Sequence, residues 1–305
     1  MLGICALFLT AGASCKKEPK AAADDPAGVI KAADAAKGGS GAATAGPVDT
    51  TPIPGVDVSK LDDKQQALFY KLVGSFSSPC GKAHSLRTSV TTDTSCKRAP
   101  FAARYLASLI DDELPEDDVR ELWEVKYKKE AVTHDFLLTS TVPHAGPEDA
   151  PIKMVEFFDY GCPACQGFKP VMDQVIRENP NTLVVYYKMF PLVDKHPDSM
   201  SAAKAALAAA KQGKFLEMHD LLFERAPKHK RADVLQYAEE LGLDVDQFQA
   251  DYDAAETQIR ADMKEGDDAG VQGTPTIFFD GRQYEGPAHP KYFRYWIDED
   301  LAVNR

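Results

Sequence analysis

The chain has 305 residues, 44% of them hydrophobic and 27% charged, which is enough for two domains of ordinary size or for one domain with a long appendage. Its net charge of −12 argues against nucleic acid or an anionic membrane surface as the main partner, because phosphate contacts need clustered Lys and Arg. We therefore expect no nucleic-acid partner.

The chain begins with the pattern of an export signal. An apolar run over residues 2–13 is too short to span a bilayer, and it ends in small residues just before Cys15. Small residues before a cysteine, followed by a polar tract, resemble the signal of a bacterial lipoprotein. This resemblance implies a signal peptide over residues 1–15, lipidation of Cys15 and a lipid anchor to a membrane. An ordinary cleaved signal peptide is the alternative.

Residues 16–56 have the composition of a tether. They consist largely of Ala, Gly, Pro, Asp and Lys, with few large apolar residues. Such a segment cannot bury enough surface to offset the entropy lost on ordering. We expect it to be disordered and to hold the folded part away from a membrane surface.

Residues 57–130 are predicted to form a small helical region. Ser59 and Asp62 have the spacing of a capping box, apolar residues follow at helical spacing, and Gly74 stands where a C-cap glycine belongs. Two more helices are expected, over about 100–110 and from about 115 onward.

The cysteines suggest how this region is stabilised. If Cys5 leaves with the signal and Cys15 carries lipid, an even number remains, namely Cys80, Cys96, Cys162 and Cys165. In an oxidising compartment a bridge between Cys80 and Cys96 would add roughly 3 kcal/mol by closing a short loop. A metal site that also uses His84, or free thiols, are the alternatives.

From His134 onward the pattern alternates between strands and helices. Predicted strands cover 134–141, 152–158 and 182–190. An alanine-rich stretch over about 197–262 has helical signatures, and a last helix is expected at about 290–301. Between them, two short strands joined by Asp280-Gly281 are typical of a hairpin. This order predicts an α/β domain with a helical insertion over about 193–268.

Cys162 and Cys165 stand at the predicted junction of a strand and a helix, separated by Pro-Ala. A cysteine at a helix N-terminus is favoured as thiolate, so Cys162 is the expected nucleophile and Cys165 the resolving thiol. A zinc site would need further ligands, and His196 has no second Cys or His beside it. A c-type haem would need His where Gln166 stands. An inert structural disulfide is the remaining alternative.

The segment over 134–305 resembles a thioredoxin-fold thiol–disulfide oxidoreductase of the DsbA-like class, which carries a helical domain inserted into the thioredoxin fold. The resemblance rests on "VEFFDYG" before the cysteine pair, on Pro170 in the following helix, and on the stretches "GKFLEMHDLLFE" and "GVQGTPTIFFDGR". It implies that Pro275 is a cis-proline facing the cysteines and that Thr274 offers backbone groups to a substrate. Glu156 matches a buried acid that exchanges a proton with the second cysteine. A solvated acid at a strand edge is the alternative for Glu156.

The function implied is thiol–disulfide exchange on exported proteins in the periplasm, with oxidase favoured over reductase or isomerase. Its partners would be exported protein thiols or disulfides and a membrane or periplasmic redox partner, without a cofactor or metal. The alternative is a lipid-anchored thioredoxin-like module that binds partners without redox turnover.

Overall fold

The computed structural model describes residues 47–127 and 132–303. The expected signal peptide, Cys15 and most of the expected tether lie outside the described residues. The helices and strands are, in chain order, α1 (Asp63–Ser75), α2 (Leu86–Thr91), α3 (Ala99–Asp111), α4 (Glu116–Tyr127), β1 (His144–Ala145), β2 (Ile152–Phe158), α5 (Pro163–Glu178), β3 (Leu183–Met189), α6 (Ser199–Lys211), α7 (Phe215–Glu224), α8 (Arg231–Glu240), α9 (Val245–Ala254), α10 (Glu256–Asp268), β4 (Thr276–Phe279), β5 (Arg282–Gln283) and α11 (Pro290–Val303).

The strands form one mixed sheet in the order β1-β3-β2-β4-β5. β2 lies at its centre, parallel to β3 and antiparallel to β4. Its sequence IKMVEFF is almost continuously apolar because both faces of the strand are covered. A residue of β2 can therefore be screened from water by strands on both sides and by helices above and below.

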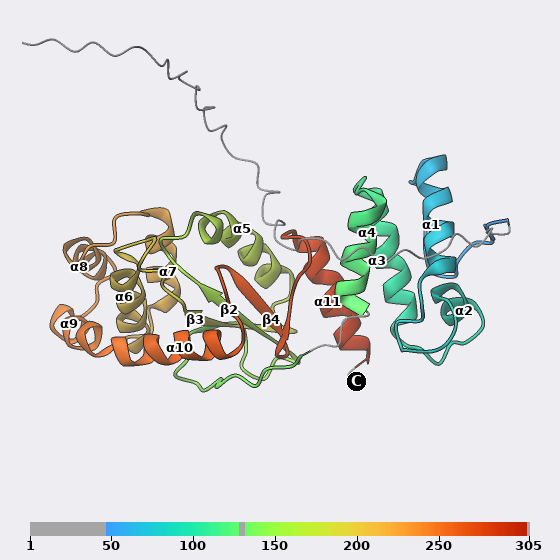
Figure 1. Cartoon of the computed structure of the whole chain (residues 1–305). Coiled ribbons are helices and arrows are strands. Elements are labelled where there is room, and N and C mark those ends of the chain that lie inside the picture. The colour runs from blue at the N-terminus through green and yellow to red at the C-terminus, as the bar shows by residue number, and fades with distance from the viewer. Residues whose placement is uncertain (1–46, 128–131, 304–305) are drawn as a thin grey trace, which may run out of the picture. The chain divides into compact units, whose positions relative to one another are not determined.

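Helices cover both faces of the sheet. On one face α5 and α11 pack against a large apolar cluster that includes Met154, Phe158 and Phe293. On the other face a second cluster around Phe157 and Phe278 receives the C-terminal end of α10 and the segment that follows it. Figure 1 shows α5 and α10 on opposite sides of the strands. The alternation of Phe157 and Phe158 between the clusters follows from the two-residue period of a strand.

The strand predicted over 134–141 is wrong. This segment pairs with no strand of the described chain, the isolated bridge of Thr133 with Arg282 lies just before it, and Leu137 is exposed. Side chains satisfy its backbone instead: Glu265 accepts from the Leu137 N–H at 2.8 Å, and the Lys188 ammonium donates to the Leu137 carbonyl at 3.1 Å. These partners are side chains from α10 and β3. Among the described residues no strand lies beside this segment for its backbone to pair with, so its local β propensity does not produce a strand.

The tight hairpin predicted at Asp280-Gly281 is present between β4 and β5. Both residues have positive φ, 44° and 81°, as a type I′ turn requires. A Cβ atom added at Gly281 would lie 2.1 Å from the carbonyl oxygen of His134, so the turn also needs glycine for close backbone approach. The predicted last helix is also present, as α11.

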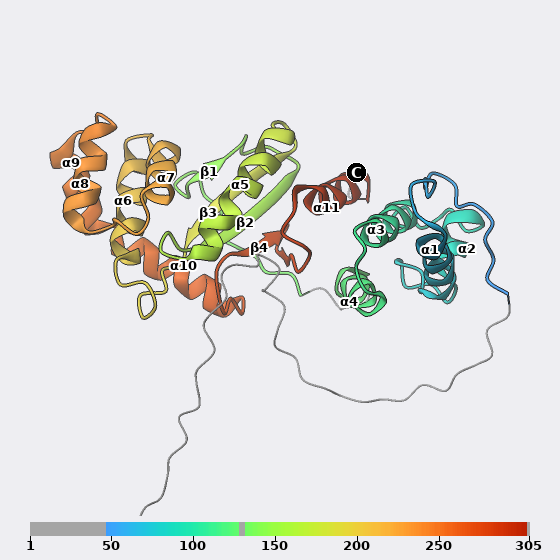
Figure 2. The ribbon, with the colours of Figure 1, turned by 90° about the horizontal axis from the view of Figure 1, so that it is seen from above.

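The helices between β3 and β4, α6 to α10, form the inserted helical part. Figure 2 shows α6, α7, α8 and α9 gathered at one end of the sheet. α6 packs through small side chains, with Ala202, Ala205 and Ala209 fully buried. Alanine permits close approach of helix backbones, which explains the alanine-rich composition of this stretch.

The helical region before the sheet contains α1 to α4, including α2, which the sequence analysis did not predict. Two predicted caps are wrong. The capping box of α1 is formed by Asp62 and Gln65 rather than by Ser59, and the helix ends at Ser75, beyond Gly74. The end of the expected tether is also ordered here, because Ile53 is 4% exposed and belongs to the core.

The helical region packs against α11 through a buried ion pair. Glu299 of α11 is 1% exposed, and its Oε2 atom lies 2.9 Å from the ammonium of Lys126. The hydroxyl of Tyr127 donates to the same oxygen at 2.8 Å, and the Arg98 guanidinium is paired with Oε1 at 3.1 Å. Burial lowers the pKa of Lys126, and the charge of Glu299 opposes that shift.

Candidate active site

The two cysteines lie where β2 leads into α5. Cys162 is the N-cap residue of α5, with extended φ and ψ of −82° and 120°, and Pro163 occupies the first turn. Proline is favoured there because the missing N–H has no partner inside the helix. The exposed fraction is 8% for Cys162 and 1% for Cys165, and both are free thiols. The pair is therefore a reduced dithiol in which only Cys162 reaches the surface.

The two thiols have opposite pKa shifts. The pKa of Cys162 is lowered from 9.0 to about 5, chiefly by a hydrogen bond from the Cys165 thiol, with further contributions from the backbone N–H groups of residues 164 and 165. Burial raises the pKa of Cys165, and the neighbouring Cys162 raises it further. A thiolate forms at Cys162 while Cys165 keeps its proton.

The loop before β4 faces the dithiol. The peptide bond between Thr274 and Pro275 is cis, and the Cys162 thiol donates to the carbonyl oxygen of Thr274 at 3.3 Å. The Thr274 hydroxyl is buried without a hydrogen-bond partner among the described residues. The structure thus brings together Cys162, Thr274 and Pro275, although more than a hundred residues separate them in the chain.

Glu156 lies at the centre of the sheet, beside Tyr187 of β3 and Ile277 of β4. It is 5% exposed, which excludes the alternative of a solvated acid at a strand edge. Burial raises its pKa from 4.5 to about 8; the charge of Asp173 adds to the rise and the charge of Lys169 opposes it. At neutral pH Glu156 is therefore mostly protonated, and in this form it can donate a proton.

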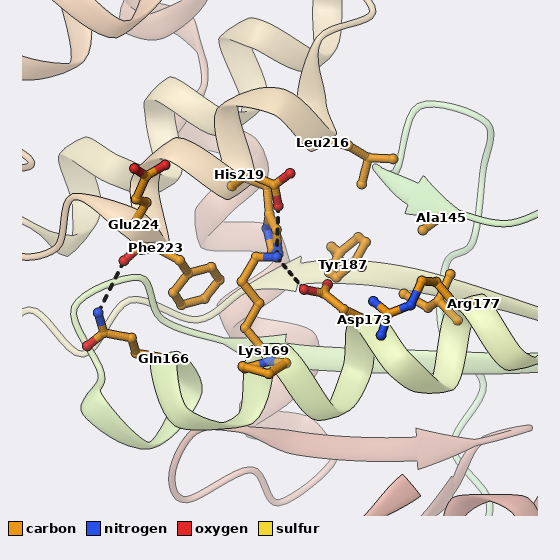
Figure 3. Close-up of a pocket in the computed structure, with 13 residues that line it drawn as sticks. Ala145, Gln166, Lys169, Asp173, Arg177, Tyr187, Leu216, His219, Phe223 and Glu224 are labelled. Carbon is orange, nitrogen blue, oxygen red and sulfur yellow. Dashed lines mark hydrogen bonds and ion pairs between the residues drawn. The ribbon is translucent and has the colours of Figure 1, made fainter.

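A groove of about 620 Å³, lined by both charged and apolar side chains, runs between α5 and α7 (Figure 3). Lys169 crosses it, with its ammonium 2.7 Å from Asp173 and 2.8 Å from Asp220. Tyr187, the strand neighbour of Glu156, also lines the groove. The sequence patterns described above predict no role for these charges. Lys169 lies one turn after Cys165, a helical spacing that could have pointed to it.

Asp159 and His196 form a second polar pair beside the dithiol. The His196 Nδ1 atom lies 2.7 Å from Asp159 Oδ2, and the Asp159 side chain is fully buried. From the sequence, His196 is expected only as a possible metal ligand, and Asp159 is not singled out. Its position three residues before Cys162 was the available signal.

The other predicted site residues lie apart from the dithiol or outside the described residues. Cys80 and Cys96 form a disulfide in the helical region, with an S–S distance of 2.02 Å, so neither offers a free thiolate to a metal. Within residues 47–127 and 132–303 no group of three or more His, Cys, Asp or Glu side chains is arranged to hold a metal ion. Lipidation at Cys15 falls outside the described part of the chain.

The same described ranges contain no helix that is both long and apolar enough to cross a membrane.

Relatives by sequence share only part of their length with this chain. It is 41% identical over 145 residues to Na(+)/H(+) antiporter NhaA 3 of Salinispora tropica, a match that covers 47% of this chain and 22% of that protein. It is 35% identical over 143 residues to Na(+)/H(+) antiporter NhaA of Herminiimonas arsenicoxydans, again with 22% of that protein covered. The chain thus spans about a fifth of these relatives.

Comparison with solved structures and with protein families identifies the fold. BdbD from Bacillus subtilis, in its oxidised form, matches with a TM-score of 0.51 at 22% identity, over 57% of this chain and 99% of that one. A thioredoxin-like oxidoreductase from Silicibacter pomeroyi matches with a TM-score of 0.49 at 29% identity, over 53% of this chain and 94% of that one. The first match shows a shared fold. The thioredoxin family model matches residues 138–299, which is more than half of the chain, and the chain therefore belongs to the thioredoxin family.

Proposed function

We propose that this protein catalyses thiol–disulfide exchange on exported proteins, with Cys162 as nucleophile and Cys165 as resolving thiol. The observation that carries the proposal is the asymmetry of the pair: the pKa of Cys162 is lowered to about 5, whereas burial raises that of Cys165. An exchange enzyme needs one thiol that attacks the substrate disulfide and a second that stays protonated until it attacks the resulting mixed disulfide.

Thr274 and Pro275 are the proposed substrate-binding residues. The Thr274 carbonyl lies 3.3 Å from the Cys162 sulfur, so a substrate strand that pairs with this backbone would carry its own sulfur toward Cys162. Glu156 is the proposed proton carrier for Cys165. It accepts the proton when Cys165 attacks a mixed disulfide and returns it when Cys165 leaves.

Oxidation of substrates is the proposed direction. A lowered pKa of Cys162 stabilises the reduced, thiolate form of the protein, which makes its disulfide a stronger oxidant. We expect a reduction potential nearer to about −120 mV than to the roughly −270 mV of a reducing thioredoxin. Equilibration with glutathione buffers measures it, and a value near −270 mV would indicate a reductase instead.

Serine variants test the assignment of the two cysteines. Cys162→Ser should abolish exchange with protein disulfides, whereas Cys165→Ser should attack and then remain joined to its substrate. A variant with both Cys80 and Cys96 replaced by serine is the matched control and should retain exchange. Trapped complexes with Cys162→Ser instead would reverse the roles, and exchange-inactive wild-type protein would favour a binding module.

Export is part of the proposal. The apolar run and the small residues before Cys15 support a lipoprotein signal, with the folded part held at a membrane in the periplasm. Intact-mass analysis of protein extracted from membranes should show an acylated Cys15. A mature chain that starts elsewhere and carries no lipid would contradict this.

A further inference from the structure

Asp159 holds its carboxylate in a fixed position in the loop between β2 and α5. One oxygen accepts from the backbone N–H of Gly161 at 2.8 Å. The other accepts from the N–H of Leu192 at 2.9 Å and lies 2.7 Å from Nδ1 of His196. Because the carboxylate only accepts, the Nδ1 atom of His196 carries the hydrogen, and the lone pair of the neutral ring is left on Nε2.

The His196 side chain is partly open to solvent. It is 20% exposed, whereas that of Asp159 is 0% exposed, and its Nε2 atom is not among the buried polar atoms that lack a partner. Among the described residues no hydrogen bond or ion pair involves His196 Nε2. The ring therefore has one nitrogen oriented by a buried acid and one available to an incoming molecule, the arrangement by which a carboxylate prepares a histidine base.

Gly161 brings His196 close to the loop that carries the nucleophile. A Cβ atom added at Gly161 would lie 2.6 Å from the Cβ of His196 and 2.4 Å from the hydroxyl oxygen of Ser199. His196 thus packs directly on the residue that precedes Cys162. The two residues between the cysteines, Pro and Ala, carry no acid or base, and Glu156 is buried within the sheet.

We propose that His196, oriented by Asp159, is the general base for the substrate thiol. This rests on the proposed exchange function. When a substrate thiol attacks the oxidised protein, its proton passes to Nε2 of His196 and its sulfur forms a bond to the Cys162 sulfur. The Cys162–Cys165 bond breaks, and the Cys165 sulfur leaves with the electron pair and takes a proton from Glu156. In the reverse direction His196 returns the proton to the departing substrate.

The test compares a substrate that needs a base with one that does not. Oxidised protein is mixed at pH 7 with a single-cysteine peptide, whose thiol is mostly protonated, or with trifluoroethanethiol, an alkyl thiol that is far more ionised at that pH. The variant is His196→Asn, whose amide can still donate to Asp159 but lacks Nε2. Ser199→Ala is the matched control, because it changes the same contact with Gly161 without removing an imidazole.

We expect His196→Asn to react with the peptide about tenfold more slowly and with trifluoroethanethiol at nearly the wild-type rate. A larger loss is not expected, because a few per cent of an ordinary thiol is already ionised at pH 7. Added imidazole should partly restore the peptide rate, Ser199→Ala should change neither rate more than about twofold, and alkylation of reduced Cys162 should be unchanged.

Three results would overturn the proposal: equal loss with both thiols, no loss with either, or a changed alkylation rate at Cys162. Equal loss would mean that His196 only supports the loop. Failure of the proposed function would look different, because wild-type protein would then oxidise neither thiol.

Discussion

Replacing Glu156 with glutamine should make the protein more stable, and the gain should grow as pH rises. The pKa of Glu156 is raised by burial from 4.5 to about 8. Between these values the folded chain binds one proton that the unfolded chain has released, so stability falls as pH increases. At about 1.36 kcal/mol per pH unit, the full loss between pH 4.5 and about 8 is about 5 kcal/mol, and at pH 7 it is about 3.4 kcal/mol.

Glu156→Gln keeps the size of the side chain and cannot ionise, so it should lack this loss. The assay is urea unfolding of the reduced protein at pH 5, 7 and 9, with wild type and variant compared at each pH. The lowered pKa of Cys162 has the opposite effect, because it makes the free energy of unfolding rise between about pH 5 and pH 9. Both proteins contain Cys162, so this effect cancels in the comparison. Glu148→Gln, which changes an exposed acid, is the control and should show no such trend.

A difference in stability between wild type and Glu156→Gln that is the same at pH 5 and pH 9 would refute this prediction. A constant difference would mean that Glu156 titrates alike in the folded and unfolded chain. A variant that becomes less stable as pH rises would mean that the ionised carboxylate has a stabilising partner in the fold.

Three further predictions follow from the same structure. Alkylation of Cys162 should have a pH midpoint near 5. The Cys165→Ala variant removes the main hydrogen-bond donor and should move that midpoint toward 9, whereas Cys165→Ser should move it less. Equal midpoints in the two variants would contradict this. Glu299→Ala should lower the free energy of unfolding, measured by chemical denaturation, by about 3–5 kcal/mol, because it leaves the buried Lys126 ammonium unpaired. A loss below about 1 kcal/mol would argue against a buried pair. Replacing Cys80 and Cys96 with serine should cost about 3 kcal/mol while exchange at Cys162 continues, and unchanged thermal unfolding would mean that the bridge adds little.

Local patterns in the sequence predicted most of the elements that carry the dithiol. The apolar run over 152–158 and the glycine-containing turn at 280–281 both appear in the structure where they were expected. Strong strand propensity, a helix N-terminus and a turn that needs positive φ are properties of a few adjacent residues. The segment over 134–141 has similar local propensity but lacks a neighbouring strand, which no short window of sequence can reveal.

Tertiary structure decided the electrostatics of the site. Whether Glu156 was solvated or buried depended on β2 lying between β3 and β4. Lys169 has one carboxylate partner on its own helix, Asp173, and gained the second, Asp220, only when α7 packed beside α5. His196 stands far from Cys162 in the chain and comes to lie on Gly161 through the folding of the loop after β3. The sequence by itself determined which atoms can react. Their pKa values and proton routes depend on desolvation and on charges from distant segments, which exist only once those segments pack together.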